Sequence, residues 1–158
     1  MIEIALYQPD IAPNAATIMR MCACLGLRVR IIEPAGFTWS DSSLKRAGMD
    51  YLAGADLVRD TSWETFRNDT RARRLVLVST RAALPYTGFR FAPGDILLMG
   101  RESAGVPEAV HEAADARVLI PMRPGMRSLN VALACAMVTG EALRQLGAFP
   151  AGPDHLGG

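Results

Sequence analysis

Short apolar runs alternate with longer amphipathic stretches along most of the chain. The apolar runs predict strands over residues 2–7, 28–33, 74–80, 95–100 and 116–121. The stretches between them predict helices over residues 14–26, 40–48, 62–69, 106–115 and 127–147. Strands that are separated by helices indicate βαβ units. We therefore predict an α/β fold with a mostly parallel sheet and helices on both of its faces.

The ends of the first and last predicted helices are marked by residues that commonly cap helices. Asn14 follows Pro13 and is predicted to be the N-cap of the first helix, and Gly26 is predicted to end that helix. Ser128 is the simplest N-cap for the last helix. Asn130 then places an amide at the head of a nearly all-apolar segment, where it needs hydrogen-bond partners if it is buried.

The length and composition place the chain among ordinary globular proteins. Its 158 residues, half of them hydrophobic and 21% charged, fit one domain with a substantial core, predicted over residues 1–150. Residues 151–158 are predicted to be a disordered tail. No uncharged apolar stretch reaches the ~20 residues that a membrane span needs, and no secretory signal pattern is present. We expect a cytoplasmic protein that has no membrane partner.

The cysteines and the net charge narrow the classes of partner. Cys22, Cys24 and Cys135 are an odd number and contain no C-x-x-C pair, so neither a disulfide framework nor a zinc site is indicated. We expect all three to be small buried hydrophobic residues, and we expect no metal. The net charge of +1 gives no overall attraction to nucleic acid, which would have to be held by local basic patches.

Residues 95–110, DILLMGRESAGVPEAV, predict a buried strand, a glycine turn and the start of a helix. This arrangement is where many α/β proteins bind phosphate, at backbone N–H groups and usually with a Lys-Ser or Lys-Thr pair. Here Val106 and Pro107 follow Gly105, and Glu102 adds a negative charge. A polyphosphate ligand is therefore disfavoured, although a nucleotide-binding α/β module remains an alternative class.

Three polar positions stand out in the loops and helix starts where α/β sheets bind their ligands. Arg20 is the only charged residue between Ile11 and Leu27. Glu102 and Asn130 are the other two. Each has a simple structural explanation, because an arginine can lie at the solvent edge of a helix, a glutamate can stabilise a helix N-terminus and an asparagine can lie near a cap.

The combination of separated motifs carries more information than any one of them. The segments PNAATIMR, GRESAGVP and IPMRPGMRSLNVA occur in this order and together resemble the three motifs of the RNA 2′-O-methyltransferases in the SPOUT superfamily. The segments LYQPDIAPN, IIEPAGFTW and LKRAGMDY resemble the branch of that superfamily that modifies the wobble nucleotide of transfer RNA. The resemblance runs from residue 1 to about residue 147.

The resemblance implies a C-terminal trefoil knot that forms a cleft for S-adenosylmethionine, and a homodimer whose subunits share the active site. In this family the cofactor is held mainly by main-chain groups of three loops, which correspond here to Val78, Gly100, Ile120 and Ser128. The resemblance also implies an active-site constellation, which consists of Asn14, Arg20, Glu102 and Asn130.

The implied reaction is transfer of a methyl group to the ribose 2′-hydroxyl of the wobble nucleotide, position 34, of a tRNA, with a cytidine or a uridine-type base. A guanidinium is a poor proton acceptor, so we interpret Arg20 as a clamp for phosphate and for the developing alkoxide. The final proton acceptor is not identified. The anticodon stem-loop would bind to basic residues, for which the candidates are the run 67–74 and Lys45, Arg46, Arg123 and Arg127.

Some positions depart from the family pattern. Ala15 and Ala16 stand where Thr-Gly is common, Ala132 stands where serine is frequent, and Arg101 stands where proline is common. These departures leave two related alternatives open, which are a catalytically silent RNA-binding relative and a 2′-O-methyltransferase that acts on another RNA.

Overall fold

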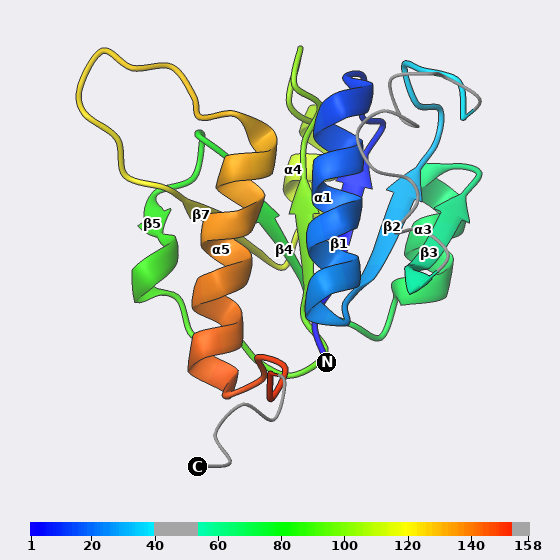
Figure 1. The fold of residues 1–158 in the computed structure, drawn as a ribbon. Helices are drawn as coiled ribbons and strands as arrows, with labels where there is room; N and C mark the ends of the chain where they lie inside the picture. Colours follow the sequence, from blue (N-terminus) through cyan, green and yellow to red (C-terminus); the bar gives the residue numbers. More distant parts are fainter. Residues whose placement is uncertain (40–53, 153–158) are drawn as a thin grey trace.

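The computed structural model describes residues 1–39 and 54–152, and within them it contains a seven-stranded sheet. The strand order is β3-β2-β1-β6-β4-β7-β5, and every neighbouring pair is parallel (Figure 1). The strands are β1 (Glu3–Tyr7), β2 (Arg28–Ile32), β3 (Asp56–Asp60), β4 (Leu75–Val78), β5 (Leu84–Pro85), β6 (Ile96–Met99) and β7 (Ala116–Leu119).

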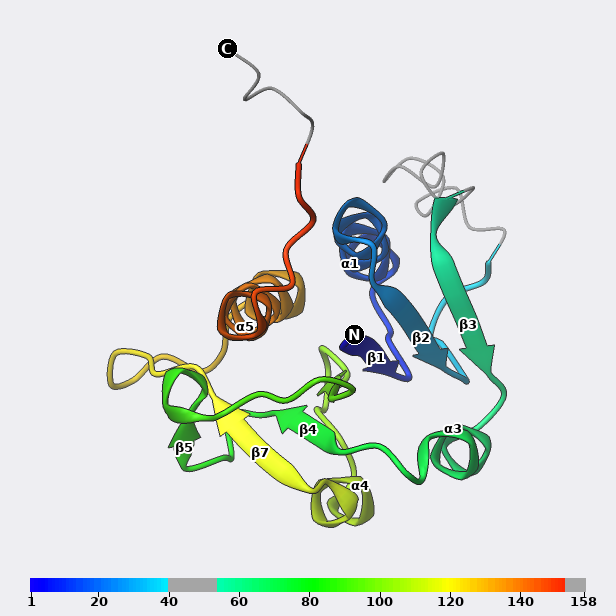
Figure 2. The ribbon, with the colours of Figure 1, turned by 90° about the horizontal axis from the view of Figure 1, so that it is seen from below.

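Helices cover both faces of the sheet, as predicted. The helices are α1 (Ala12–Leu25), α3 (Trp63–Thr70), α4 (Glu108–Ala113) and α5 (Val131–Leu146), with a short 3₁₀ helix η2 (Tyr86–Gly88). Figure 2 shows α1 and α5 on one face and α3 and α4 on the other. The hydrophobic core accordingly divides into two clusters, one beneath α1 and α5 and the other beneath α3 and α4.

The central strands are apolar throughout because both of their faces are covered. All residues of β1 and β6 are buried, and so are the first three of β4. These strands correspond to the runs that the sequence predicted. The edge strands β3 and β5 were not predicted as strands, because β3 is charged at both ends and β5 has only two residues.

The caps of α1 and α5 differ from the prediction. Helix α1 begins before Asn14, with Ile11 at the N-cap and no side-chain cap, so Asn14 lies within the first turn. Helix α5 begins later than predicted, and its N-cap is Asn130 rather than Ser128. The Asn130 side chain accepts hydrogen bonds from two backbone N–H groups of its own helix, at 2.9 and 3.3 Å. Gly26 ends α1 with a φ of 68°, which confirms its prediction.

The cysteines divide into two environments. Cys22 and Cys135 are buried, as predicted, and burial raises the pKa of both thiols. Cys24 is exposed, so its predicted burial is wrong. It lies two residues after Cys22 on α1, which turns its side chain to nearly the opposite side of the helix.

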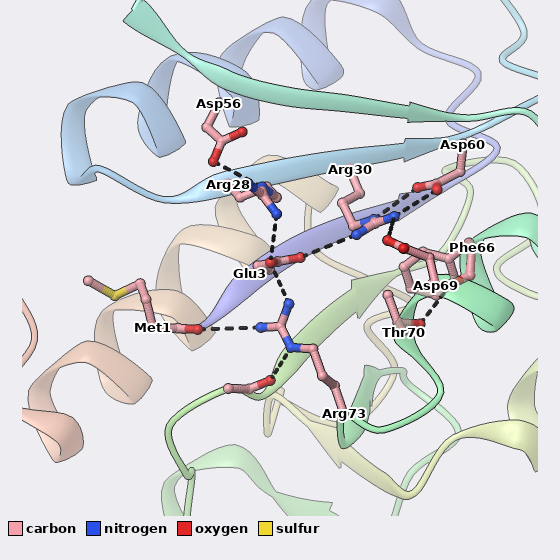
Figure 3. Close-up of polar contacts among 11 residues, drawn as sticks. Met1, Glu3, Arg28, Arg30, Asp56, Asp60, Phe66, Asp69, Thr70 and Arg73 are labelled. Atoms are coloured by element: carbon pink, nitrogen blue, oxygen red, sulfur yellow. Dashed lines mark hydrogen bonds and ion pairs between the residues drawn. The ribbon is translucent and has the colours of Figure 1, made fainter.

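A network of charged residues crosses β1, β2 and β3, from Glu3 at the start of β1 through Arg30 in the middle of β2 to Asp60 at the end of β3 (Figure 3). Glu3 forms ion pairs with Arg28, Arg30 and Arg73. The Arg30 side chain is only 4% exposed. It bonds both carboxylate oxygens of Asp60, at 3.0 and 2.8 Å, and it reaches Asp69 at 2.6 Å. Such a buried charge is tolerated because it is fully paired.

The helix predicted over residues 40–48 and most of the predicted tail lie outside the described residues. Among the helices that the structure describes, none is long and apolar enough to cross a membrane.

Candidate active site

A cavity of about 540 Å³ opens at the carboxyl ends of β4, β6 and β7. The loops that follow these strands extend from one edge of the sheet, at which α1 also begins (Figure 1). This is the edge where parallel α/β sheets usually bind ligands. The cavity is lined by all four residues that the resemblance assigned to the cofactor, which are Val78, Gly100, Ile120 and Ser128.

The loop after β6 is closed by its own backbone. Arg101 and Gly105 exchange two N–H···O hydrogen bonds of 2.9 Å each. A Cβ atom on Gly100 would lie 2.9 Å from the carbonyl carbon of Gly105, so only glycine fits there. Gly105 adopts a φ of 63°, which also favours glycine. The glycines of this stretch therefore serve a tight turn at the cavity wall.

Three of the predicted catalytic residues meet at this cavity. The side-chain amide of Asn130 donates to Oδ1 of Asn14 at 3.0 Å, and the amide of Asn14 donates to Oε1 of Glu102 at 3.5 Å. They come from the start of α5, the first turn of α1 and the loop after β6. Because Oδ1 of Asn130 accepts the capping bonds of α5, its amide nitrogen is directed toward Asn14.

Asp10 belongs to the same group, although the sequence reading did not single it out. Its backbone N–H donates to Oε2 of Glu102 at 3.1 Å, and its carboxylate accepts a short hydrogen bond from Ser103. A sign was present in the sequence, because Asp10 follows shortly after an apolar strand, where α/β proteins place ligand-binding side chains.

Asp10 and Glu102 respond to each other electrostatically. Burial raises the pKa of Glu102, and the hydrogen bond with the Asp10 side chain raises it further. The same hydrogen bond lowers the pKa of Asp10, with help from Ser103 and Arg101. The pKa values of the two carboxyl groups are therefore pushed apart, and that of Glu102 is the higher.

Arg101 ties this loop to the segment after β1. Its guanidinium lies 3.9 Å from Oδ2 of Asp10 and donates to Oε1 of Gln8 at 3.4 Å. Gln8 has a φ of 41°, a left-handed conformation that is uncommon for residues other than glycine. The departure from the family pattern at position 101 thus coincides with direct contacts to two residues of the first loop.

Arg20 does not line this cavity, unlike the other three predicted catalytic residues. It is exposed on α1, six residues after Asn14, which turns it by about 240° around the helix. Within a single chain, Arg20 therefore points away from the side of α1 that carries Asn14.

The residues predicted to bind RNA have different outcomes. Arg127 lines the cavity, and Arg123 is exposed on the same loop. Lys45 and Arg46 lie outside the described residues. The basic run 67–74 is largely engaged within the chain: Arg71 bonds Asn68, Arg73 bonds Glu3, and Arg74 bonds Asp95. The pairs of Arg73 and Arg74 lie at the edge opposite the cavity, where β1, β4 and β6 begin, so this part of the prediction is not supported.

No group of three or more metal-binding side chains occurs in the part of the chain that the structure describes. Among the residues that the structure describes, the positively charged ones that line the cavity are Arg101 and Arg127, and Val106 and Pro107 stand where the helix start follows the loop. A triphosphate site of the P-loop type would need a lysine at the helix start, so this cavity does not fit one.

Comparison with known proteins shows the family to which this chain belongs. The model of the SpoU rRNA Methylase family matches residues 1–140, a span that includes every strand of the sheet and every loop that forms the cavity. The chain belongs to the SpoU methylase family.

Individual SpoU relatives match over nearly their whole length. The chain is 65% identical over 148 residues to the tRNA (cytidine(34)-2'-O)-methyltransferase of Beijerinckia indica, with 92% of each chain covered. A solved structure described as "Structural insights into the 2-OH methylation of C/U34 on tRNA" has a TM-score of 0.88 and 40% identity, over 93% of this chain and 97% of that one.

A third comparison concerns the cofactor. The SpoU methyltransferase AviRb from Streptomyces viridochromogenes, solved in complex with the cofactor AdoMet, has a TM-score of 0.83 and 25% identity. The match covers 92% of this chain and 60% of AviRb. The SpoU fold of this chain is therefore one that binds AdoMet in a relative.

Proposed function

We propose that this protein transfers a methyl group from S-adenosylmethionine to the ribose 2′-hydroxyl of the wobble nucleotide of tRNA, a cytidine or uridine at position 34. The observation that carries the proposal is the cavity in which Asn14, Glu102 and Asn130 converge beside a glycine loop. By their names and descriptions, relatives that match most of this chain act on this nucleotide.

The residues of the cavity fit S-adenosylmethionine. The glycine at position 100 lets the loop close on itself, so that the backbone of residues 100–105 forms a wall of the cavity. Glu102 supplies a carboxylate, which suits a ligand with a sulfonium and an ammonium group. The bound cofactor would supply the methyl group, and the protein would position that group for transfer.

We further infer the trefoil knot of this family in the C-terminal part, with residues 1–150 forming one methyltransferase domain. The strand order supports this arrangement, since β6 and β7 lie on either side of β4, and the loops after β4, β6 and β7 all border one cavity. A chain path of this kind would hold three cofactor-binding loops against one another.

Glu102 is the group that we propose to accept the proton of the 2′-hydroxyl. A general base works best when its pKa lies near the working pH, and burial raises the pKa of Glu102 in that direction. Asn14 contacts Glu102 and Asn130, so it would position the carboxylate and the ribose together. This assignment fills the role for which the sequence offered no candidate.

Arg20 would act across a homodimer. It lies away from the cavity of its own chain, whereas the family's active site is shared between subunits, so one copy would offer Arg20 to the cavity of another. Apolar side chains are exposed beside the cavity and along α5, as an interface requires; these are Leu129, Leu133 and Met137. Arg20 would clamp an RNA phosphate and stabilise the developing alkoxide.

The RNA would approach the edge of the sheet that carries the cavity. Arg127 lines the cavity, and Arg123 extends the same loop, so both would contact the phosphates of the anticodon stem-loop. Lys45 and Arg46 remain candidates for the same role. We propose that the protein works in the cytoplasm, where its proposed tRNA substrate is found.

The experiment is methyl transfer from isotope-labelled S-adenosylmethionine to unmodified tRNA, followed by digestion and mass spectrometry of the labelled nucleoside. We expect a 2′-O-methylated cytidine or uridine from the anticodon fragment. A matched tRNA that carries a 2′-deoxynucleotide at position 34 should accept no label, because it lacks the attacking hydroxyl.

Other outcomes select the alternatives. Label at another position, or in ribosomal RNA, would favour a methyltransferase for another RNA, which is the substrate in the family's own description. RNA binding without cofactor affinity would favour a catalytically silent relative.

A further inference from the structure

A second, smaller pocket of about 310 Å³ lies beside the carboxyl ends of β2 and β3. Its lining combines two aromatic side chains, Phe37 and Trp39, with the charged residues Glu33 and Arg59. Nothing in the catalytic proposal uses this pocket. We propose that it holds one unstacked base of the RNA substrate, next to the nucleotide in the cavity, an inference that rests on the proposed function.

The pocket presents a stacking surface that is already assembled. The guanidinium carbon of Arg59 lies 4.4 Å from the ring centroid of Trp39, and Phe37 packs edge-on against the same ring at 5.9 Å. Aromatic rings and arginine planes are the groups on which proteins stack single-stranded bases. The pocket thus offers the flat surface that a nucleobase needs.

Glu33 holds the two stacking groups in place. Its Oε1 accepts from Nε of Arg59 at 2.6 Å and from the indole N–H of Trp39 at 3.2 Å. Arg59 and Trp39 are both only partly buried, so each retains surface for a ligand. An ordinary core cluster would instead bury these side chains completely.

The position of the pocket connects it to the cavity. The backbone N–H of Gly36 donates to the carbonyl of Pro9 at 2.9 Å, and a Cβ on Gly36 would lie only 2.8 Å from Cβ of Asp10. Asp10 in turn bonds Glu102 in the cavity. Only the short segment of Pro9 and Asp10 therefore separates the two sites, which suits neighbouring nucleotides of one strand.

A nucleobase is favoured over a peptide side chain because the pocket lies at the proposed RNA-binding edge. Its charged residues form a neutral pair, Arg59 with Glu33, so a phosphate would find no excess positive charge there. A neutral and planar group matches both the charge and the shape. Arg123 and Arg127 follow β7, on the far side of the cavity from this pocket, so they would contact other phosphates of the same RNA.

The test uses Arg59→Lys, which keeps the charge and removes the planar surface. Arg74→Lys is the matched control, because Arg74 also stacks on an aromatic ring, Phe89 at 4.8 Å, and also pairs with a carboxylate, Asp95, but at the opposite edge of the sheet. We expect Arg59→Lys and Trp39→Ala to weaken binding of an anticodon stem-loop by about 5- to 100-fold, the range for loss of one stacked base. We expect Arg74→Lys to leave it unchanged.

An abasic series identifies the base. In a series of stem-loops that each lack one base, we expect one position at which removal of the base weakens binding to the wild type. Removal of that same base should not weaken binding to Trp39→Ala any further. If each abasic stem-loop weakens binding to Trp39→Ala as much as it weakens binding to the wild type, the proposal is overturned. Equal effects of Arg59→Lys and Arg74→Lys on stem-loop affinity would overturn it as well. The dissociation constant for S-adenosylmethionine should stay within about twofold throughout, since the pocket does not touch the cavity.

A fluorescence measurement separates this proposal from the proposed reaction. The chain has two tryptophans, so Trp63→Phe leaves Trp39 as the only one. Quenching of Trp39 by a stem-loop, in a protein that transfers no methyl group, would support the pocket and contradict the reaction. Methyl transfer to tRNA with no change in Trp39 emission would support the reaction and contradict the pocket.

Discussion

Glu102 combines an unfavourable electrostatic position with a proposed catalytic role. Its raised pKa means that the folded protein binds its proton more tightly than the unfolded chain does. The contribution of Glu102 to stability is therefore lost as pH rises above ~4.5 through the raised pKa. Asp10 has a lowered pKa, so its own contribution is lost only at lower pH, as pH falls through that lowered value.

We expect Glu102→Gln to unfold at the same or a higher temperature than the wild type at pH 7.5, while methyl transfer falls about 100-fold or more. Glutamine removes a negative charge from beside Asp10, and its amide cannot accept a proton from the ribose. Thermal unfolding at pH 5 and 7.5, together with single-turnover rates, measures both effects. Glu108→Gln, on the surface of α4, is the control for loss of a carboxylate and should retain activity.

Asn130 has two separable tasks, because one oxygen caps α5 and the amide nitrogen contacts Asn14. Asn130→Asp keeps the cap and removes the donor, so we expect near-wild-type stability and at least a tenfold loss of turnover. Asn130→Ala loses both tasks and should also cost about 1 kcal/mol of unfolding free energy. Urea denaturation distinguishes the two variants, and equal stability of both would show that the cap contributes nothing.

The sequence predicted much of the site because its separated motifs together resemble one family, whereas each residue alone has a structural explanation. Asn14, Glu102 and Asn130 interrupt apolar or glycine-rich segments, and the structure brings all three together. Asp10 escaped notice because an acid beside a proline in a loop is common. Arg20 stood out as the one charged residue of an apolar helix and was grouped with the others through the resemblance, and its orientation on α1 could not follow from spacing without knowing where the helix begins.

At the scale of elements, the loop after β6 depends on glycine at position 100. A methyl group there would meet the backbone of Gly105, which has no freedom to move aside. We expect Gly100→Ala to weaken S-adenosylmethionine binding at least tenfold in calorimetry and to lower the melting temperature. Gly140→Ala, within α5 and with no atom within 4 Å of its Cβ, is the matched control. The unfolding free energy of that variant should rise by up to about 1 kcal/mol, because alanine favours a helix more than glycine does. Equal affinity in both variants would contradict this account of the loop.

The network around Arg30 stabilises the edge of the sheet that β3 forms, by joining β3 to β2. We expect Arg30→Ala to cost about 3 kcal/mol of unfolding free energy, because Asp60 would be left buried without its partner. Arg28→Ala, in the same network but half exposed, should cost less than about 1 kcal/mol. Denaturant unfolding measures both values. Cofactor affinity should not change in either variant, and a change in it would show that this edge and the cavity are coupled.

Elements were predicted well where their pattern is long and apolar, as in β1, β6 and α5. The misses have physical causes of two kinds. Edge strands such as β3 and β5 are short or charged because only part of their surface is covered, so they lack an apolar run. The start of α1 was displaced because Pro13 occupies its first turn, where proline is well tolerated, and the start of α5 because Asn130 rather than Ser128 caps it.

At the scale of the whole molecule, the separation of Arg20 from the cavity makes a shared site testable. Two inactive variants, Arg20→Ala and Glu102→Gln, should restore activity when their subunits are mixed and allowed to exchange. Half of the dimers would then be mixed, each with one intact site, so activity should approach about a quarter of the wild type. Mixing that restores nothing would place the whole site within one chain. Sedimentation of each variant checks that both still dimerise.

The self-closed loop after β6 has a consequence for how the cofactor arrives. Because Arg101 and Gly105 already exchange both backbone hydrogen bonds, little conformational entropy remains to be lost when a ligand enters. The pocket wall is thus preorganised rather than induced. Association should proceed in one kinetic step, and its rate should rise linearly with cofactor concentration instead of levelling off at the speed of a loop closing.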